Sequence, residues 1–533
     1  MLASVVAAVA IAGALPAADA RSEHRFVDAG SIARELTTSS PESVIQDDAG
    51  FLHQPENVIA QNLARTKALG IERIRVTAGW SVIAPDPDAR VKPRFDDADP
   101  GAYPPGNWAN LDRLVRMADA AGLKVMIDIA FWAPRWATKA PRAQRARLRT
   151  DIDPVLYSHF ARAVARRYSG TWTPAAPRPS GHLTIPLTRP SAKPPAPLPA
   201  VGIFTIWNEP NHPGFATPQW TREDGRLIPH QADVYRAMVR AAYPQIKSVA
   251  PGARVLIGAT SPGGATATGR GGVTPLRFIR RFACVDGRWR PIHSGPCRHF
   301  TTIPGDGWAH HAYSLQTLPS QIPMDGDKLP VANTGRLLWA LDRLVRTRRL
   351  APANRDLYLT EYGYETSPPD PRARFSPEQQ AQLLSWAEFI ATRSPRVKMW
   401  PNFELVDRPG WRAGPGMRPF GDWQTGLYFA DGTPKPAAGA YRTPTFASCV
   451  RRGGRTTVMV WGRIRGSHQT AAARLEETGG PAGVRSAGPV AVVPAEGETL
   501  RFVPYVRGAR YRLHWEPVGE APIDGPLTAP VDC

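Results

Sequence analysis

The sequence of 533 residues lacks several of the features by which common enzyme classes are recognised. It has only four cysteines, and their spacing fits no zinc site. It contains no glycine-rich fingerprint for a dinucleotide or a phosphate, and no Gly-x-Ser-x-Gly motif of a serine hydrolase. Only residues 2–15 form a long apolar run, which is too short to span a bilayer comfortably. These absences argue against a nucleotide-dependent enzyme, a serine hydrolase and a protein with several membrane spans.

Acidic residues are few relative to basic ones, with 46 Asp and Glu against 66 Lys and Arg, so the net charge is +20. Such an excess can attract nucleic acid, an anionic membrane or an acidic polysaccharide. The arginines are spread along the chain, however, with no basic helix carrying interleaved aromatic residues and no known nucleic-acid module. We therefore expect no nucleic-acid partner. The charge leaves open a generally arginine-rich protein and a protein with an anionic partner.

The N-terminal segment resembles an export signal. The apolar run 2–15 is followed by Ala18-Asp19-Ala20, a small-x-small cleavage site, and then by polar residues. We predict a signal peptide at 1–20 and a secreted, extracellular protein, either free or associated with the cell wall, with no membrane contact after cleavage. An uncleaved membrane anchor is the alternative, because the basic segment that usually opens a signal peptide is missing.

Four cysteines suit an exported protein, because disulfide bonds persist in oxidising compartments. Cys284 and Cys297 flank a short loop, and Cys449 and Cys533 flank the C-terminal region. We predict the disulfides Cys284–Cys297 and Cys449–Cys533, although four cysteines allow three pairings. In the chain-entropy picture, closing the shorter loop stabilises the fold by about 3 kcal/mol.

Between residues 21 and 443, short apolar runs alternate with segments of helical periodicity. After a first strand ending near Gln46, strands are predicted at 71–76, 123–130, 201–207, 253–259, 308–313, 357–361 and 397–403, and helices at 55–69, 108–121, 154–168, 232–249, 275–282, 334–346 and 377–394. Such alternation indicates parallel βαβ units. About eight strands without a dinucleotide fingerprint favour an α/β fold of the (β/α)8 TIM-barrel type. A proline-rich run at 171–199 is predicted to be a surface excursion.

Beyond Thr443 the helical signal ends, and short alternating runs separated by Gly- and Pro-rich turns begin. The runs at 456–461, 489–493, 501–505 and 509–513 are typical of antiparallel strands. We predict a small C-terminal β-sandwich domain at 444–533, packed as an accessory domain on the barrel at 21–443. No internal repeat is evident.

Two of the predicted strands end in a glutamate. The run 201–207 is apolar, β-branched and aromatic, and the next residues include Glu209-Pro210. The strand 357–361 repeats this design and ends in Glu361. In a parallel barrel all strands end at the same face, so the two glutamates are expected to meet across its mouth. Two facing carboxyl groups are the machinery of glycoside hydrolysis, which is the chemistry that we infer from them.

At these positions the chain resembles the retaining glycoside hydrolases of clan A. Residues 206–211, Ile-Trp-Asn-Glu-Pro-Asn, look like their acid/base signature and are most similar to family 39, with family 5 close behind. Residues 360–363, Thr-Glu-Tyr-Gly, look like the nucleophile end of the seventh strand in that clan. The resemblance covers about residues 50–442. It implies Glu209 as general acid/base and Glu361 as catalytic nucleophile, without a cofactor.

The resemblance also implies roles for residues around the pair. Asn208 would bind the sugar 2-hydroxyl group, which requires a backbone turn before Glu209, since neighbours in a strand face opposite ways. His311 and Tyr313 share one face of their strand. In the clan the tyrosine of such a His-x-Tyr binds the nucleophile, and we expect His311 to contact substrate. Arg75, at the end of an early strand, is a suitable cation for keeping the nucleophile ionised. A turn asparagine and ordinary core residues are the alternatives.

Several tryptophans at or near strand ends are candidate sugar platforms, with core packing as an equal alternative: Trp80, Trp132, Trp136 and Trp400. In the clan the eighth strand often carries a tryptophan just before Phe-x-x-x-Asp. Here residues 403–407 keep that tail, but Asn402 occupies the place of the tryptophan. We expect Trp400, two residues earlier on the same face, to substitute for it.

We expect no metal, because strand alternation separates the rings of His310 and His311 and no carboxylate completes a ligand set. The predicted partner is a carbohydrate substrate, a β-linked oligo- or polysaccharide, and the protein is expected to act as a monomer. Two other functions share these residues: a non-catalytic polysaccharide-binding protein on the same barrel, and a transglycosylase that remodels glycans. The C-terminal domain is expected to be structural, with carbohydrate binding as the alternative.

Overall fold

A computed structural model describes residues 41–139, 149–174, 196–265, 271–410, 423–466, 471–480, 483–487, 491–493, 497–517 and 521–533. The predicted signal peptide at 1–20 and most of the proline-rich run at 171–199 lie outside the described residues. Within these ranges, no helix combines the length and the apolar character that crossing a bilayer requires.

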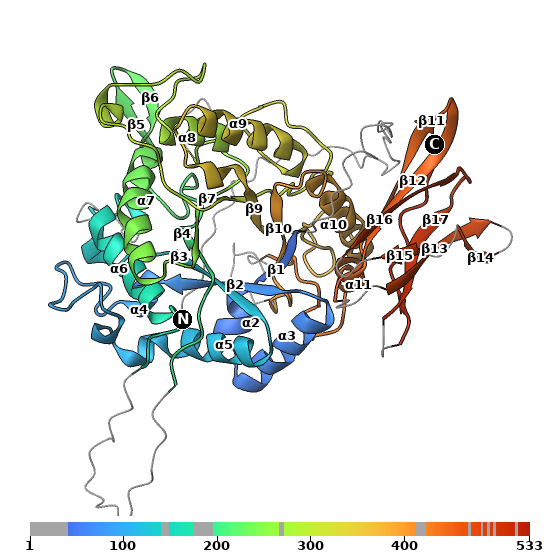
Figure 1. The fold of residues 1–533 in the computed structure, drawn as a ribbon, viewed down its shortest axis with the longest axis horizontal. Coiled ribbons are helices and arrows are strands. Elements are labelled where there is room, and N and C mark those ends of the chain that lie inside the picture. Colours follow the sequence, from blue (N-terminus) through green and yellow to red (C-terminus); the bar gives the residue numbers. More distant parts are fainter. Residues whose placement is uncertain are drawn as a thin grey trace, which may run out of the picture.

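Eight parallel strands close into a barrel in the order β1-β10-β9-β8-β7-β4-β3-β2, with helices around it (Figure 1). The strands are β1 (Glu42–Gln46), β2 (Arg73–Gly79), β3 (Lys124–Ala130), β4 (Ile203–Ile206), β7 (Arg254–Thr260), β8 (Trp308–His311), β9 (Leu357–Glu361) and β10 (Val397–Phe403). The closing pair, β1 with β10, runs in parallel from Glu42 opposite Met399 to Gln46 opposite Phe403. This arrangement confirms the predicted (β/α)8 barrel.

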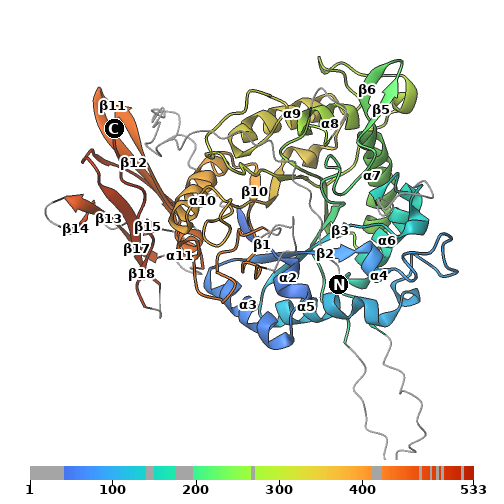
Figure 2. The ribbon, with the colours of Figure 1, turned by 180° about the vertical axis from the view of Figure 1, so that it is seen from behind.

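The connecting helices lie around the outside of the barrel (Figure 2). Most of their buried apolar side chains belong to the main hydrophobic core. The helices are α2 (Asp48–Leu52), α3 (Glu56–Ala68), α4 (Trp80–Ile83), α5 (Ala109–Ala120), α6 (Pro154–Arg167), α7 (His230–Val249), α8 (Pro275–Phe282), α9 (Thr334–Arg346), α10 (Pro377–Ala391) and α11 (Pro436–Arg442). Local sequence sets several helix starts. Asp153 caps α6 by accepting two backbone N–H groups, with Pro154 as first helical residue. Ser376 and Gln379 form a capping box on α10.

The barrel interior is apolar in its middle and polar toward the end at which the strands terminate. One closed cluster takes residues from every barrel strand except β2: Val44, Met126, Ile203, Leu256, Ala259, Ala309, Tyr358 and Met399. Because side chains alternate along a strand, the residues two positions further on also face inward. On β1, β3 and β4 these are Gln46, Asp128 and Thr205, all buried. Polar groups therefore line the interior at the C-terminal ends of the strands, next to the apolar cluster that fills the middle of the barrel.

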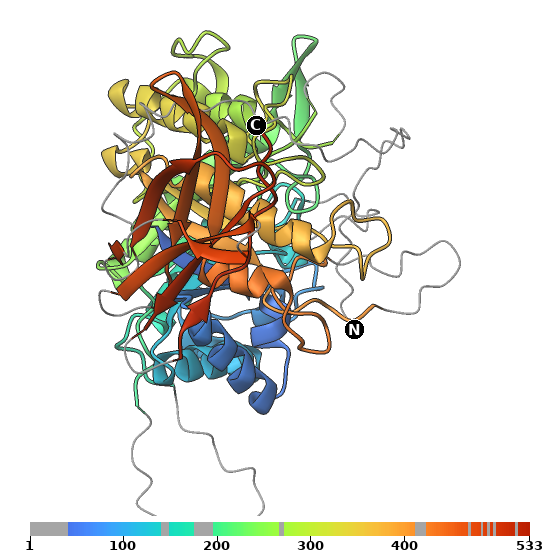
Figure 3. The same cartoon turned by 90° about the vertical axis from the view of Figure 1, so that its right-hand side faces the viewer.

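The C-terminal region forms two antiparallel sheets beside the barrel (Figure 3). One sheet has the order β11-β12-β16, and the other β14-β13-β17-β18 with β15 on β13. The strands are β11 (Thr445–Arg452), β12 (Arg455–Arg463), β13 (Ala471–Gly480), β14 (Gly483–Ser486), β15 (Ala491–Val493), β16 (Glu498–Pro504), β17 (Arg510–Glu516) and β18 (Ile523–Asp524). The predicted β-sandwich is confirmed. The hairpin of β5 (Trp220–Glu223) and β6 (Arg226–Pro229), after β4, was not predicted.

Both predicted disulfide bonds are present. Cys284–Cys297 closes the short loop that follows α8. Cys449 on β11 holds Cys533 at the C-terminal end, across a sequence separation of 84 residues. The second bond therefore ties the final segment of the chain to the first strand of the sandwich.

An aromatic and ionic contact joins the sandwich to α10. Trp386 of α10 stacks on Phe446 of β11 with the ring centroids 5.5 Å apart. Glu388, which is 1% exposed, is shared by Arg463, 3.2 Å away, and by Arg465. Both guanidinium groups are also buried. Buried charges are tolerated only where they are paired, so this cluster ties the two domains together.

Glu388→Ala is expected to lower the free energy of unfolding by about 3–5 kcal/mol, because it removes the carboxylate that two buried arginines share. Chemical denaturation followed by circular dichroism measures this. The control is Glu378→Ala on the same helix, where an exposed carboxylate bonds to Ser376 and an effect below about 1 kcal/mol is expected. Equal losses in the two variants would contradict the assigned role of Glu388.

Candidate active site

Strand β4 ends in a backbone turn of the kind that the sequence argument required. Trp207 and Glu209 have φ angles of 61° and 38°, in the left-handed region that non-glycine residues seldom adopt. The Trp207 N–H donates to the Ile129 carbonyl at 3.1 Å, and the Glu209 N–H donates to the Ala259 carbonyl at 2.9 Å. These bonds to β3 and β7, the neighbours of β4, hold the strained turn in place. As a result, the adjacent side chains of Asn208 and Glu209 both reach the mouth of the barrel.

Asn211, the last residue of the 206–211 motif, is a structural anchor. It is fully buried, and its amide donates to the carbonyls of Ser261 at 3.1 Å and Val273 at 2.9 Å. Its side-chain oxygen accepts the Ser261 N–H at 2.8 Å. The loop after β4 is therefore tied to the loop after β7, which limits the movement of Glu209.

Glu209 and Glu361 meet across the mouth of the barrel, as their strand positions predicted. One carboxylate oxygen of each lies within 4.8 Å of the other, and both side chains keep a small exposed area, 13% and 12%. The register of β8 against β9 shifts by one residue, so that His311 pairs with Glu361. An unbroken register would pair His311 with Thr360. The shift turns the Glu361 side chain toward the inside of the barrel. Retaining glycosidases hold their two carboxyl groups about 5–5.5 Å apart.

His311 lies between the two carboxylates. Its Nδ1 is 2.9 Å from Glu209 Oε1 and 3.4 Å from Glu361 Oε2. Burial, together with the charges of Arg75 and His310, lowers the pKa of His311 well below its usual value, so the ring is neutral near pH 7. The resemblance implied that His311 contacts substrate, and in the structure its Nδ1 lies closest to the carboxyl group of Glu209.

Arg75 is the fixed cation beside Glu361, as predicted from its place at the end of an early strand. Its Nη1 donates to Glu361 Oε1 at 2.5 Å and to Gln46 Oε1 at 2.9 Å. Its Nη2 lies 3.1 Å from Asp128 Oδ2, and the side chain is 1% exposed. Tyr313 donates to the other oxygen of Glu361 at 3.2 Å, as the resemblance implied. Each oxygen of Glu361 thus accepts one hydrogen bond, which favours the ionised form.

Arg75 also orients Asn208, because its Nη2 donates to Asn208 Oδ1 at 3.1 Å. A guanidinium group can only donate, so the amide oxygen must face Arg75. Within the described part of the chain, Nδ2 of Asn208 has no hydrogen-bond partner. The amide N–H groups are therefore available to donate to a ligand oxygen.

The two carboxyl groups differ in proton affinity. Burial and the charge of Glu361 raise the pKa of Glu209 well above its usual value, with Arg75 opposing the rise. Burial also raises the pKa of Glu361, but the charge and hydrogen bond of Arg75 and the hydrogen bond from Tyr313 oppose it. Glu361 is therefore the more acidic member, and a proton held by the pair resides on Glu209.

Glu209, His311 and Glu361 together have the donor types of a metal site. The sequence argument expected no carboxylate near the His310–His311 pair, and the structure corrects this, since both glutamates lie close to His311. These atoms are engaged with one another, and the Arg75 guanidinium contacts Glu361. A further cation at this place would be repelled by Arg75. The expectation of no metal stays a prediction.

Three of the proposed sugar platforms, Trp80, Trp136 and Trp400, are buried in the core. Trp80 is 0% exposed and stacks on Phe160 with the ring centroids 5.4 Å apart. Trp136 packs edge-on against it. Trp400 is also 0% exposed, because alternation along β10 turns Met399 into the barrel interior and Trp400 toward the helices. None of Trp80, Trp136 and Trp400 presents an open face to a sugar, so we correct all three to core packing.

Trp132 and Trp423 are half-buried, and each contacts a residue of the site or of the loop after β4. Trp132 donates from Nε1 to the Gly214 carbonyl at 3.2 Å, in the loop after β4, and stays a candidate platform. Trp423 was missed by the sequence argument. Its ring centroid lies 5.0 Å from that of Tyr313 and 5.8 Å from that of Phe403. A loop after the eighth strand thus places an aromatic ring beside Tyr313 and Phe403.

Two residues that hold Arg75 were also missed. Gln46 accepts from Arg75, and Asp128 pairs with it while accepting a hydrogen bond from the hydroxyl of Thr205. The available signal for Asp128 was a lone charged residue inside the apolar run 125–130. A buried carboxylate in such a run needs a cationic partner on a neighbouring strand, which here is Arg75.

No family model matches the chain, and no curated protein matches it. Solved structures that match include GH5_18 from Streptomyces cattleya in complex with GlcNAc, at 16% identity over 75% of this chain and 79% of that chain, with a TM-score of 0.44. A glucosidase from Croceicoccus marinus matches at 12% identity over 83% and 92%, with a TM-score of 0.44. The endo-beta-1,4-mannanase from Thermotoga petrophila matches at 13% identity over 96% and 99%, with a TM-score of 0.38. At these values the likeness carries no argument about the reaction, and the resemblance to family 39 stays a prediction.

Proposed function

We propose that the protein is a retaining glycoside hydrolase that cleaves O-glycosidic bonds of a β-linked oligo- or polysaccharide. The observation that carries the proposal is the pair Glu209 and Glu361, whose oxygens approach within 4.8 Å and whose proton affinities differ. Double displacement requires one protonated and one ionised carboxyl group at about this separation. The resemblance of the flanking sequences to families 39 and 5 supports the same reaction.

The reaction has two steps. First, an oxygen of Glu361 attacks the anomeric carbon while the bond to the leaving oxygen breaks, and Glu209 gives its proton to that oxygen. Second, Glu209, now a carboxylate, takes a proton from water, whose oxygen attacks the anomeric carbon and displaces Glu361. Both carboxyl groups return to their starting states, so no cofactor is needed.

The neighbouring residues prepare each glutamate for its role. Arg75 and Tyr313 fix the plane of the Glu361 carboxylate through one bond to each oxygen. With a proton on Nδ1, His311 donates to Glu209 Oε1 and leaves the other oxygen of Glu209 to carry the transferable proton. Asn208 donates to a sugar hydroxyl group, and that bond strengthens as charge develops on the ring.

Domain roles and location follow from the same proposal. Residues 21–443 form the catalytic domain and residues 444–533 a structural accessory domain. We place the enzyme outside the cell, free or associated with the cell wall, where it acts as a monomer. The predicted signal peptide and the two disulfides support export, because such bonds persist in oxidising compartments.

The test is intact-mass measurement after incubation with a panel of 2-deoxy-2-fluoro β-glycosyl fluorides, followed by peptide mapping. The 2-fluoro group slows both steps by destabilising the positively charged transition state, while the fluoride leaving group still allows the first step. A glycosyl-enzyme should therefore accumulate. We expect one sugar per chain on Glu361, and the sugar that reacts identifies the specificity of the first subsite.

Glu361→Gln is the control, and it should form no adduct. An adduct on a different residue of the wild type would overturn the assignment of the nucleophile. Folded wild-type protein that reacts with none of the panel would contradict the retaining mechanism and favour the polysaccharide-binding alternative.

A further inference from the structure

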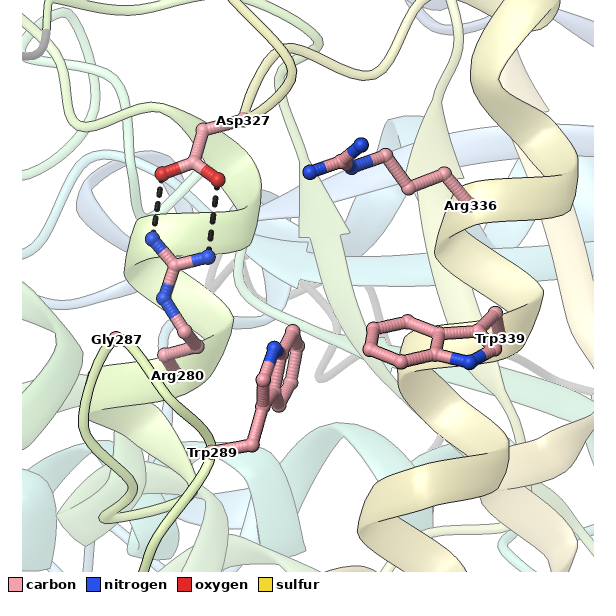
Figure 4. A pocket seen from close by; sticks show the side chains of 6 residues that line it. All are labelled: Arg280, Gly287, Trp289, Asp327, Arg336 and Trp339. Carbon is pink, nitrogen blue, oxygen red and sulfur yellow. Dashed lines mark hydrogen bonds and ion pairs between the residues drawn. The ribbon is translucent and has the colours of Figure 1, made fainter.

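A hollow of about 480 Å³ lies on the outer side of the barrel, bordered by α8, α9 and the disulfide loop 284–297 (Figure 4). Its lining residues are Arg280, Gly287, Trp289, Asp327, Arg336 and Trp339. They are separate from the residues that surround the glutamate pair. The volume falls in the range of small-ligand sites, about 300–1,000 Å³.

Two tryptophans form a corner in this hollow. The ring centroids of Trp289 and Trp339 are 5.3 Å apart, and their planes meet at 89°. Trp339, on α9, is 47% exposed, although a large apolar ring gains most from burial. Figure 4 shows the two rings at the lower side of the hollow. The apolar C–H face of a sugar ring fits against such an indole surface.

The loop that carries Trp289 is held in shape before any ligand binds. The disulfide Cys284–Cys297 closes it. Within it, the carboxylate of Asp286 accepts two backbone N–H groups of the loop, at 2.8 and 2.9 Å. A corner that is already ordered loses little conformational entropy on binding. The hollow is therefore pre-organised on this side.

The cations of the hollow differ in their availability. Arg280 forms two hydrogen bonds with the carboxylate of Asp327, which neutralises it. Arg336 is exposed and, within the described part of the chain, has no hydrogen bond or ion pair. The guanidinium group of Arg336 packs against Gly326. A Cβ atom added to this glycine would lie 3.1 Å from Cζ of Arg336. Figure 4 shows the Arg336 side chain extending from α9 over the hollow. A planar, unpaired guanidinium group matches the geometry of a carboxylate.

We propose that this hollow binds an acidic sugar, a hexuronic acid residue of a polysaccharide, apart from the site of the glutamate pair. The ring packs in the tryptophan corner, its carboxylate binds Arg336, and the Asp327–Arg280 pair exchanges hydrogen bonds with its hydroxyl groups. The net charge of +20 attracts a polyanion to the whole protein, and the hollow gives that attraction a defined place. Binding here does not require turnover, so it stands independently of the proposed reaction.

The test is calorimetric titration of the full chain with tetragalacturonate and with its fully methyl-esterified form, which share a backbone and differ in charge. About 0.15 M salt limits long-range attraction, since the screening length is then about 8 Å. The variants are Arg336→Gln and Trp339→Ala. The matched control is Arg346→Gln, which removes one charge from an exposed arginine of the same helix.

We expect the wild type to prefer the acid over the ester by about tenfold, and Arg336→Gln to abolish this preference. Trp339→Ala should weaken binding of both forms about tenfold, and Arg346→Gln should change neither. The proposal would be overturned by equal effects of the two arginine variants or by equal affinities for acid and ester. It would also be overturned if the wild type bound neither tetragalacturonate nor a second hexuronic acid oligomer, tetramannuronate. Turnover of the aryl β-glycoside of the sugar that labels Glu361 should be unaltered in both hollow variants, which separates this test from that of the proposed function.

Discussion

Glu361→Gln is expected to lower kcat on the order of 10⁴-fold or more for the aryl β-glycoside of the sugar that labels the enzyme, which keeps its 2-hydroxyl group and is turned over. The amide nitrogen and oxygen of glutamine are too weakly nucleophilic to attack an anomeric carbon, so the glycosyl-enzyme cannot form. The size of the side chain is kept, and its oxygen can still accept from Arg75, so the fold should survive. Steady-state turnover and the thermal midpoint measured on the same sample check both expectations.

The matched control is Glu42→Gln, at the opposite end of the barrel. Glu42 pairs with Arg73 at 2.9 Å, and Arg73 lies on the same strand as Arg75. The control thus also removes a glutamate that pairs with an arginine of β2, but far from the strand ends. We expect its turnover to stay near that of the wild type. A similar loss of turnover in both variants would mean that the effect of Glu361→Gln is structural.

Much of the barrel could be predicted because its strands are buried on both faces and its helices are amphipathic. The predicted bounds of the strand at 357–361 and of the helices at 275–282 and 334–346 agree with β9, α8 and α9. The sandwich was harder to predict. Strand β11 ends in two arginines, and β13 carries charged residues along its length, so their strand character depends on pairing with partners far along the chain.

The glutamate pair could be predicted because it depends only on where strands end. The direction in which a side chain faces is harder to predict. Trp400 and Asn402 do share a face, as expected, but that face of β10 lies toward the helices. In an apolar run, the sequence does not indicate whether the odd-numbered or the even-numbered residues face the barrel interior. Trp80 opens the short helix α4, which turns its ring into the core. Trp423 reaches Tyr313 through a loop whose path depends on tertiary contacts.

Glu209→Ala is the second large effect, and its size should depend on the leaving group. A sugar or alkyl alcohol leaves poorly without a proton, so kcat/KM for such glycosides should fall about 10²–10⁴-fold. A 2,4-dinitrophenol leaves as a stable phenolate and needs no acid. The first step with that substrate should therefore change far less. Comparing kcat/KM for the two substrates isolates the acid role, because this parameter reports on the free enzyme and the first committed step.

The pH dependence of the activity tests the acid role of Glu209 independently. Because Glu209 must be protonated in the first step and its pKa is raised by burial and by Glu361, activity should hold below the raised pKa and fall as pH rises through it. That basic limb should be absent when Glu209→Ala acts on the dinitrophenyl glycoside. Azide, which attacks without a general base, should speed the second step and release a β-glycosyl azide. An equal loss on both substrates, or a basic limb that persists in Glu209→Ala, would place the acid elsewhere.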